Sequence, residues 1–200
     1  CVSSTFATST ITVNTTPTIA VNSGSICAGN NFTISPSGAS TYTIQGGSAI
    51  KTPTSNTTYT VTGTSSAGCV SSSFATSSIT VNATPTITVN SGSICAGNNF
   101  TITPSGANTY TIQGGSAIKT PTANATYTVI GTSSAGCVSS TFATSNVTVN
   151  ATPTITANSG SICEGQSFTI SPSGANTYTI QGGSAIKTPT ANATYTVIGT

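Results

Sequence analysis

The chain has 200 residues, of which only 2 % are charged, with three Lys+Arg against one Asp+Glu and no histidine. This composition excludes general acid–base catalysis, carboxylate-bound calcium and histidine-bound zinc, because the residue types that they need are missing or occur once. A net charge of +2 also excludes the basic face that nucleic acids require, so we expect no enzyme and no cofactor.

Ser and Thr occupy 77 of the 200 positions. Polar chains of low complexity are usually disordered, but they also carry a high net charge and few apolar residues. This chain has little charge, and Ile, Val, Tyr and Phe recur in it at regular spacing. No apolar run approaches the 18 or more residues of a membrane helix. We therefore expect a folded chain without a membrane span.

A period of 68 residues organises the whole sequence, and residues 69–132 match residues 137–200 at 56 of 64 positions. Such identity predicts the same structure for each repeat copy. In chain order, we expect residues 1–14 to be the last strand of a preceding copy and residues 15–82 and 83–150 to be complete copies. Residues 151–200 are expected to be a third copy without its last strand.

Two explanations of the incomplete ends remain open. The favoured one is that the chain is part of a much longer repetitive polypeptide. The alternative is that residues 1–14 of one molecule complete the third copy of the next molecule, as in a strand-donation polymer.

Within a copy, alternation of apolar and polar residues predicts strands and excludes helices. In chain order, the second copy is expected to form strands at residues 86–90, 99–103, 109–113, 116–120, 125–132 and 137–150, with turns at SGS, PSGA, QGG, TPTAN and SSAG. Val138 and Phe142 have the opposite parity to Val147 and Val149, which predicts a bulge near residues 143–146.

Six or seven short strands in 68 residues predict an all-β fold of tandem antiparallel sandwiches of immunoglobulin-like type. A core of this size rarely supplies more than roughly 3–5 kcal/mol of stability. Additional fastening is therefore expected, from disulfides, from contacts between copies or from lateral assembly.

Two cysteines per copy without a CxxC motif indicate disulfides and an oxidising compartment. The second and sixth strands of such a sandwich run in the same sense, which places Cys95 and Cys137 at opposite ends of one copy. The favoured pair is therefore Cys27–Cys137, which joins two copies, and the alternative is Cys27–Cys69 with Cys95–Cys137. The full set of candidate disulfide residues is Cys1, Cys27, Cys69, Cys95, Cys137 and Cys163.

Other residues give weaker indications. Lys119 beside an asparagine suggests an isopeptide bond, but two of the copies lack the carboxylate that this reaction needs, so we expect a solvated lysine that discourages edge pairing. Glu164 replaces Ala28 and Ala96 at a loop position and is attributed to surface drift. No histidine or aspartate exists to activate a serine.

Threonine arrays and N-x-S/T sequons offer two further hypotheses. Ranks of outward Thr hydroxyls suggest binding of ice or of a glycan, although a twisted sandwich is a poor ice template. The sequons permit glycosylation, and they lie at Asn14, Asn31, Asn56, Asn82, Asn99, Asn124, Asn146, Asn150 and Asn192.

The strings SICAG at Cys27 and Cys95, PSGA, ATYTV, and SSAGC at Cys69 and Cys137 carry a family resemblance along the whole chain. The chain resembles the immunoglobulin-like and PKD-like tandem repeats of very large surface proteins that gliding and related bacteria export through the type IX pathway. The resemblance implies cell-surface stalks, adhesins and extracellular fibres. Ile112 stands where the third strand of that family carries tryptophan, and the scarcity of Asp argues against calcium-stiffened linkers.

Together these observations predict a structural repeat of an extracellular fibre or cell-surface stalk, which gains reach and mechanical strength from disulfide-fastened sandwiches. The alternative is a surface adhesin module that binds a glycan or another surface through Thr/Asn-rich faces. The expected partners are further copies of the chain, head to tail or side by side.

Overall fold

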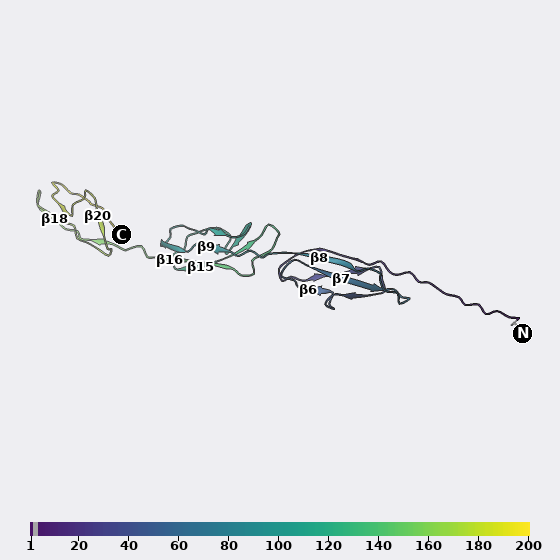
Figure 1. Ribbon diagram of the computed structural model, residues 1–200. Coiled ribbons are helices and arrows are strands. Elements are labelled where there is room, and N and C mark those ends of the chain that lie inside the picture. The colour runs from purple at the N-terminus through teal and green to yellow at the C-terminus, as the bar shows by residue number, and fades with distance from the viewer. Residues whose placement is uncertain (2–3) are drawn as a thin grey trace. The chain divides into compact units, whose positions relative to one another are not determined.

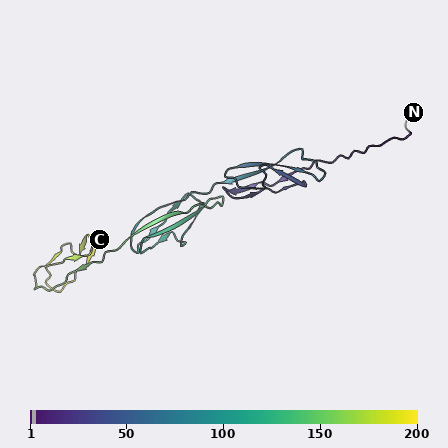
Figure 2. The same ribbon diagram turned by 90° about the horizontal axis from the view of Figure 1, so that it is seen from below.

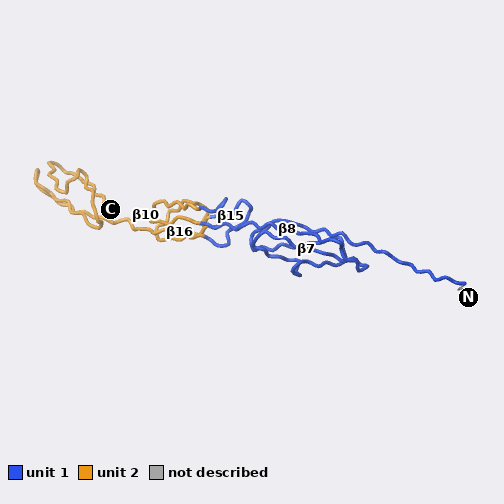
Figure 3. Tube along the Cα trace, viewed as in Figure 1, with its two compact units in different colours: residues 1–87, 105–111, 130–142 blue, residues 88–104, 112–129, 143–200 orange. Residues whose placement is uncertain are grey.

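The computed structural model describes residues 1 and 4–200, so Val2 and Ser3 of the predicted strand 1–14 lie outside it. Strands make up all of its regular secondary structure in this described part (Figure 1). The chain divides into two compact units (Figure 3). Unit 1 contains Cys1–Ile87, Ser105–Thr111 and Ile130–Phe142, and unit 2 contains Thr88–Pro104, Ile112–Val129 and Ala143–Thr200. Copies one, two and three below denote the predicted repeat copies 15–82, 83–150 and 151–200, whose boundaries remain a prediction.

The same strands recur at an interval of 68 residues. Copy one contains β1 Ala20–Val21, β2 Gly24–Cys27, β3 Phe32–Thr33, β4 Pro36–Ser37, β5 Thr41–Ile44, β6 Ile50–Lys51, β7 Thr57–Thr64 and β8 Ala75–Asn82. Copy two contains β9 Thr88–Val89, β10 Gly92–Cys95, β11 Phe100–Thr101, β12 Pro104–Ser105, β13 Thr109–Ile112, β14 Ile118–Lys119, β15 Ala125–Thr132 and β16 Ala143–Asn150.

Each complete copy is a two-layered sandwich (Figure 2). In copy one, one layer is a four-stranded sheet in the order β2-β8-β7-β5, and the other consists of the antiparallel pairs β1–β4 and β3–β6. Strand β8 lies antiparallel to β7 and parallel to β2. The strands of this sheet that come first and last along the chain, β2 and β8, are therefore neighbours. The all-β, immunoglobulin-like fold expected from the sequence is thereby confirmed.

The core lies between the two layers and consists of the residues that alternation assigned to the inner face. Ile34, Val61 and Ile79 are at most 2 % exposed in copy one. The ring of Phe32 on β3 lies so close to Gly24 on β2 that an added Cβ would stand 2.8 Å from it. The two layers therefore approach each other closely at this glycine, where a larger residue would force them apart.

The turn between β4 and β5 has a local sequence requirement. Gly38 has a φ of 100°, which L-residues other than glycine rarely adopt, and a Cβ there would collide with the carbonyl oxygen of Thr18. The Tyr42 hydroxyl accepts a hydrogen bond from the Ala39 N–H at 2.9 Å and donates one to the Ala39 carbonyl at 2.8 Å. The string PSGA thus encodes a turn that a tyrosine closes.

Two sequence predictions about strands are wrong. The expected long strand 137–150 is regular only over β16, Ala143–Asn150, whose pairing with β15 continues without a bulge from Ala143 to Val147. The change in parity instead marks a loop, in which Val138 is 53 % and Phe142 62 % exposed. The predicted SGS turn is also wrong in part, because Gly92–Cys95 forms β10 parallel to β16. Alternation of polar and apolar residues at every second position does not reveal an edge strand as short as β10.

Copy three contains fewer strands: β17 Thr156–Ala157, β18 Phe168–Thr169, β19 Pro172–Ser173, β20 Tyr178–Ile180, β21 Ile186–Lys187 and β22 Val197–Gly199. They pair as β17–β19, β18–β21 and β20–β22. Residues 160–163, the counterparts of β2 and β10, are not a strand here. Their partner in the complete copies is the last strand, for which residues 151–200 have no counterpart.

Candidate functional site: the disulfide at the repeat junction

The first half of this site is the end of β2. Cys27 is the last residue of β2 and lies opposite Asn82, the last residue of the parallel strand β8. The next residue, Ala28, donates its N–H to the Asn82 carbonyl at 2.9 Å. Strand pairing thus fixes Cys27 at the end of copy one where the chain passes into copy two.

The second half is a turn that follows β15 in copy two. The Cys137 N–H donates to the Ser133 hydroxyl at 3.1 Å, and the Ser133 N–H donates to the Cys137 carbonyl at 2.8 Å. Gly136 has a φ of 79°, which suits glycine, and closes the turn. Cys137 is fully buried, and its Sγ lies 3.8 Å from the Asn82 carbonyl oxygen.

A disulfide joins Cys27 to Cys137, with a Cα–Cα distance of 5.5 Å and a sequence separation of 110. This is the pair that the common sense of the predicted second and sixth strands favoured. In the structure, the parallel pairing of β2 with β8 brings Cys27 to the start of copy two. The alternative pairs Cys27–Cys69 and Cys95–Cys137 are not formed, since each would need a cysteine that this bond already uses. The bond covalently links two successive copies.

The four other predicted disulfide residues, Cys1, Cys69, Cys95 and Cys163, are free thiols in this structure. Cys69 lies in the turn of copy one that is equivalent to the Cys137 turn of copy two, and its N–H donates to Ser65 Oγ at 3.1 Å. Its Sγ donates to the Asn14 carbonyl at 3.7 Å. Cys95 lies opposite Asn150 at the end of β10, as Cys27 lies opposite Asn82. Both halves of the junction are therefore present in copies one and two.

The lysine of each copy has a structural position that sequence reasoning missed. The Lys51 side chain is only 9 % exposed, its Nζ donates to the Gln45 carbonyl at 2.6 Å, and it lies 4.7 Å from the centre of the Tyr59 ring. Lys119 lies over Tyr127, and Lys187 over Tyr195. The expected solvated lysine is wrong for Lys51 and Lys187, each 9 % exposed, where a carbonyl and an aromatic face compensate the buried charge. Lys119 makes the same contacts but is only half-buried. The constant spacing of Gln, Lys and Tyr in each copy was the available indication.

Two other kinds of site, a metal site and a reactive serine, have little support in the described residues. They contain no group of three or more His, Cys, Asp or Glu side chains placed to hold a metal ion. The buried serines are structural, since Ser77 Oγ donates to the Asn22 carbonyl and Ser145 Oγ to the Asn90 carbonyl, each at 2.7 Å. A search of the described residues for a helix long and apolar enough to cross a membrane finds none.

No protein-family model and no curated protein matches the chain. Several solved structures are similar. One is a Ca²⁺-stabilised adhesin that helps an Antarctic bacterium bind ice, with 17 % identity and a TM-score of 0.40 over 83 % of this chain and 61 % of that chain. A three-Ig fragment of titin has 10 % identity and a TM-score of 0.37 over 84 % of this chain and 79 % of that one. The eight N-terminal Ig domains of the Down syndrome cell adhesion molecule have 14 % identity and a TM-score of 0.31 over 82 % and 33 %.

The chain therefore spans less than two thirds of that adhesin structure. Identities at this level concern the fold alone. The chain consists of tandem immunoglobulin-like sandwiches, as the strand pairing described above establishes.

Proposed function

We propose that the chain is a structural repeat of an extracellular fibre or cell-surface stalk, in which disulfides carry load from one sandwich to the next. The observation that carries this proposal is the Cys27–Cys137 bond, which joins successive copies instead of the two halves of one copy. A bond within one copy would stabilise that copy only. A bond between copies also limits how far the chain between them can be stretched.

The amino-acid composition and the oxidising compartment that a disulfide indicates support the same proposal. Disulfides persist in oxidising surroundings, outside the cytosol, and the resemblance to type IX-exported surface repeats agrees with a cell-surface location. A surface with 2 % charged residues offers little repulsion between copies, which favours association. The proposed role is therefore mechanical, and the partners are further copies of the same repeat.

Single-molecule pulling on the whole chain tests this role. The residues between Cys27 and Cys137, which are 110 positions apart, cannot extend while the bond is intact, so at ~3.5 Å per residue about 380 Å of length stays locked. We expect the oxidised chain to extend about 380 Å less than the same chain in dithiothreitol or than the Cys27→Ser variant.

The matched control is Cys95→Ser, which removes a cysteine that is a free thiol here and should leave the locked length unchanged. Equal extension of the oxidised chain and of Cys27→Ser would refute the mechanical role. Binding of the chain to a glycan array in that case would favour the adhesin alternative.

A further inference from the structure

The four-stranded sheet of each complete copy ends in a strand that has a neighbour on one side only. In copy one this edge strand is β5, which pairs with β7, and in copy two it is β13, which pairs with β15. Both edge strands have the sequence TYTI. A strand in this position presents main-chain hydrogen-bonding groups that a further strand can use.

The pairing with β7 shows which groups of β5 point to the open edge. Tyr42 lies opposite Gly63. The Gly63 N–H donates to Ser71 Oγ at 3.2 Å, and the Gly63 carbonyl accepts from the Ser71 N–H at 2.8 Å, both on the side of β7 away from β5. Because bonded and non-bonded pairs alternate along an antiparallel ladder, the N–H and C=O of Tyr42 and of Ile44 are directed away from β7.

These groups make the open edge both a donor and an acceptor. Tyr42 offers its N–H and its carbonyl, and Ile44 offers its N–H. The Ile44 carbonyl accepts from the Gly47 N–H at 2.9 Å and keeps its second lone pair. In copy two the same two bonds recur between Gly131 and Ser139, so β13 presents the same edge.

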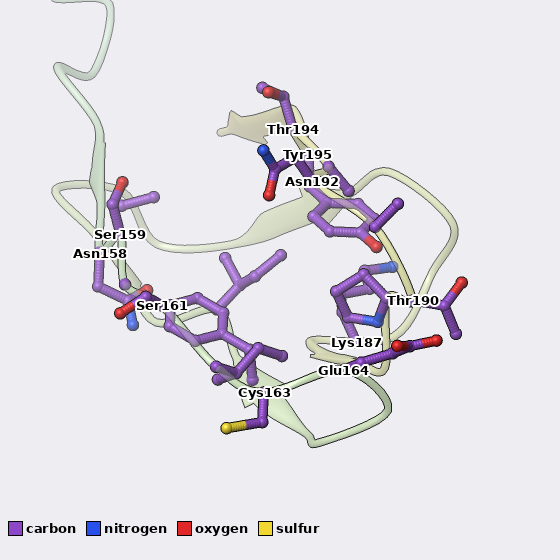
Figure 4. Close-up of a pocket in the computed structure, with 18 residues that line it drawn as sticks. Asn158, Ser159, Ser161, Cys163, Glu164, Lys187, Thr190, Asn192, Thr194 and Tyr195 are labelled. Carbon is purple, nitrogen blue, oxygen red and sulfur yellow. The ribbon is translucent and has the colours of Figure 1, made fainter.

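The edge has none of the common protections against pairing, which are a charged side chain, a proline or a bulge. Thr41 and Thr43 are the exposed side chains of β5, and its register with β7 is continuous. The lysine of each copy is turned elsewhere. Lys51 lies over a tyrosine ring of β7, and Lys187 lies in the same way beside Tyr195 in copy three (Figure 4). No charge therefore keeps another strand away from β5.

The occupant that fits this edge is the same edge of a second molecule. Its donors and acceptors alternate along the strand, so it is complementary to itself when one strand is reversed. Two copies without charge at the contact do not repel each other. Contact of one surface with its own kind is isologous and has twofold symmetry. In one continuous sheet this symmetry makes the two strands antiparallel.

We propose that molecules of this chain associate through β5 and β13, by antiparallel pairing of TYTI with TYTI of a second molecule. The free groups set the register, with Thr43 opposite Thr43 of the second molecule. On each side of this central pair, Tyr42 of one molecule and Ile44 of the other exchange two main-chain hydrogen bonds. The sheets of the two molecules thereby become one continuous sheet, with both Thr43 side chains on its exposed face.

The twofold symmetry has a consequence for function. The two molecules run in opposite directions where they pair, as chains that extend from two facing surfaces do. The inference deepens the proposed function, because it names the surface through which copies associate, and its role outside the cell rests on that function.

Analytical ultracentrifugation of the whole chain tests the proposal. Serine replaces the four free thiols, Cys1, Cys69, Cys95 and Cys163, so that association does not arise from new disulfides, while Cys27–Cys137 stays intact. We expect this parent chain to associate reversibly, to an extent that increases with concentration.

A set of lysine substitutions on the edge strands should weaken this association. The edge set is Thr43→Lys, Thr111→Lys and Thr179→Lys, all at exposed positions. The dissociation constant should rise at least about tenfold, because like charges then lie directly opposite each other. The matched control set is Thr58→Lys, Thr126→Lys and Thr194→Lys, which are exposed positions away from the edge. It adds the same charge and should associate like the parent.

Complementary charges provide the second test. Glutamate at the three edge positions should weaken association as lysine does, and an equimolar mixture of the lysine and glutamate edge sets should associate again, because opposite charges then face each other. Recovery of association in the mixture also shows that both edge sets are folded.

Three results would overturn the proposal: a parent chain that is monomeric at every concentration, an edge set that associates as tightly as the control set, or a mixture that stays dissociated. Each leaves the locked length between Cys27 and Cys137 unchanged, since that bond lies within one molecule. Failure of the edge pairing is therefore distinguishable from failure of the proposed function.

Discussion

Lys51 shows how a nearly uncharged chain uses one of its few charges. Its Nζ donates to the Gln45 carbonyl and lies over the Tyr59 ring, and its side chain is 9 % exposed. No carboxylate is needed, because the carbonyl dipole and the ring face both attract the ammonium group. The aliphatic stem packs at the same time, so the lysine fastens the QGG turn to β7.

Replacement of the lysine by methionine in all three copies keeps the stem and removes the charge. We expect a loss of about 1–2 kcal/mol per copy, from one charge-assisted hydrogen bond and one cation–π contact. Urea unfolding measures it. The control replaces the neighbouring isoleucine by threonine in all three copies, Ile50, Ile118 and Ile186, which are 55–58 % exposed, and should change stability by less than about 0.5 kcal/mol. Equal losses in both sets would refute the role of the charge.

At the scale of elements, the short edge strand depends on side-chain hydrogen bonds as well as on its four-residue ladder. Ser145 on β16 is fully buried, and its Oγ donates to the carbonyl of Asn90, two residues before β10 begins. Ser77 and Asn22 make the same bond in copy one. A serine on the core face is therefore required where alternation alone would place an apolar residue.

Ser145→Ala leaves the Asn90 carbonyl without this partner, so we expect a loss of about 1–3 kcal/mol. Faster hydrogen exchange at the amides of β10 should accompany it, because the loop before that strand is released. Thr144→Ala changes an exposed neighbour on the same strand and should leave both measurements nearly unchanged. Unaltered exchange in β10 of the Ser145 variant would contradict this account.

The sequence predicts the strands in which apolar and polar residues alternate strongly. It misses the strands that form only because they pair with a neighbouring strand. Phe100, Tyr127 and Val129 lie on strands as expected because apolar and polar residues alternate there, whereas Ile102 is buried but lies just after β11. Strand β10 was missed because GSIC has turn composition, and it becomes a strand only beside β16. Cys27–Cys137 could be favoured from strand directions. The constant spacing of Gln, Lys and Tyr indicates a shared role, but the burial of Lys51 against Tyr59 does not follow from it, since that depends on a turn that folds the chain back.

For the whole molecule, the disulfide closes a loop with a sequence separation of 110. Loops of about this length stabilise a fold by roughly 3–5 kcal/mol, through the lower entropy of the unfolded chain. We expect the double variant Cys27→Ser with Cys137→Ser to lose about this amount in urea unfolding under oxidising conditions. In dithiothreitol the parent and the variant should unfold nearly alike, and a difference that survives reduction would show that packing, not the bond, is responsible.

The parallel pairing of β2 with β8 has a mechanical consequence. Because the chain enters copy one ahead of β2 and leaves it at the end of β8, a pull on the two ends of the copy slides these neighbours past each other along their common axis. The hydrogen bonds between them are then loaded together, in shear. In a hairpin pulled from one end, the same bonds would break one after another, as a zipper opens. The sandwich thus resists extension by its topology before any sulfur atom bears load.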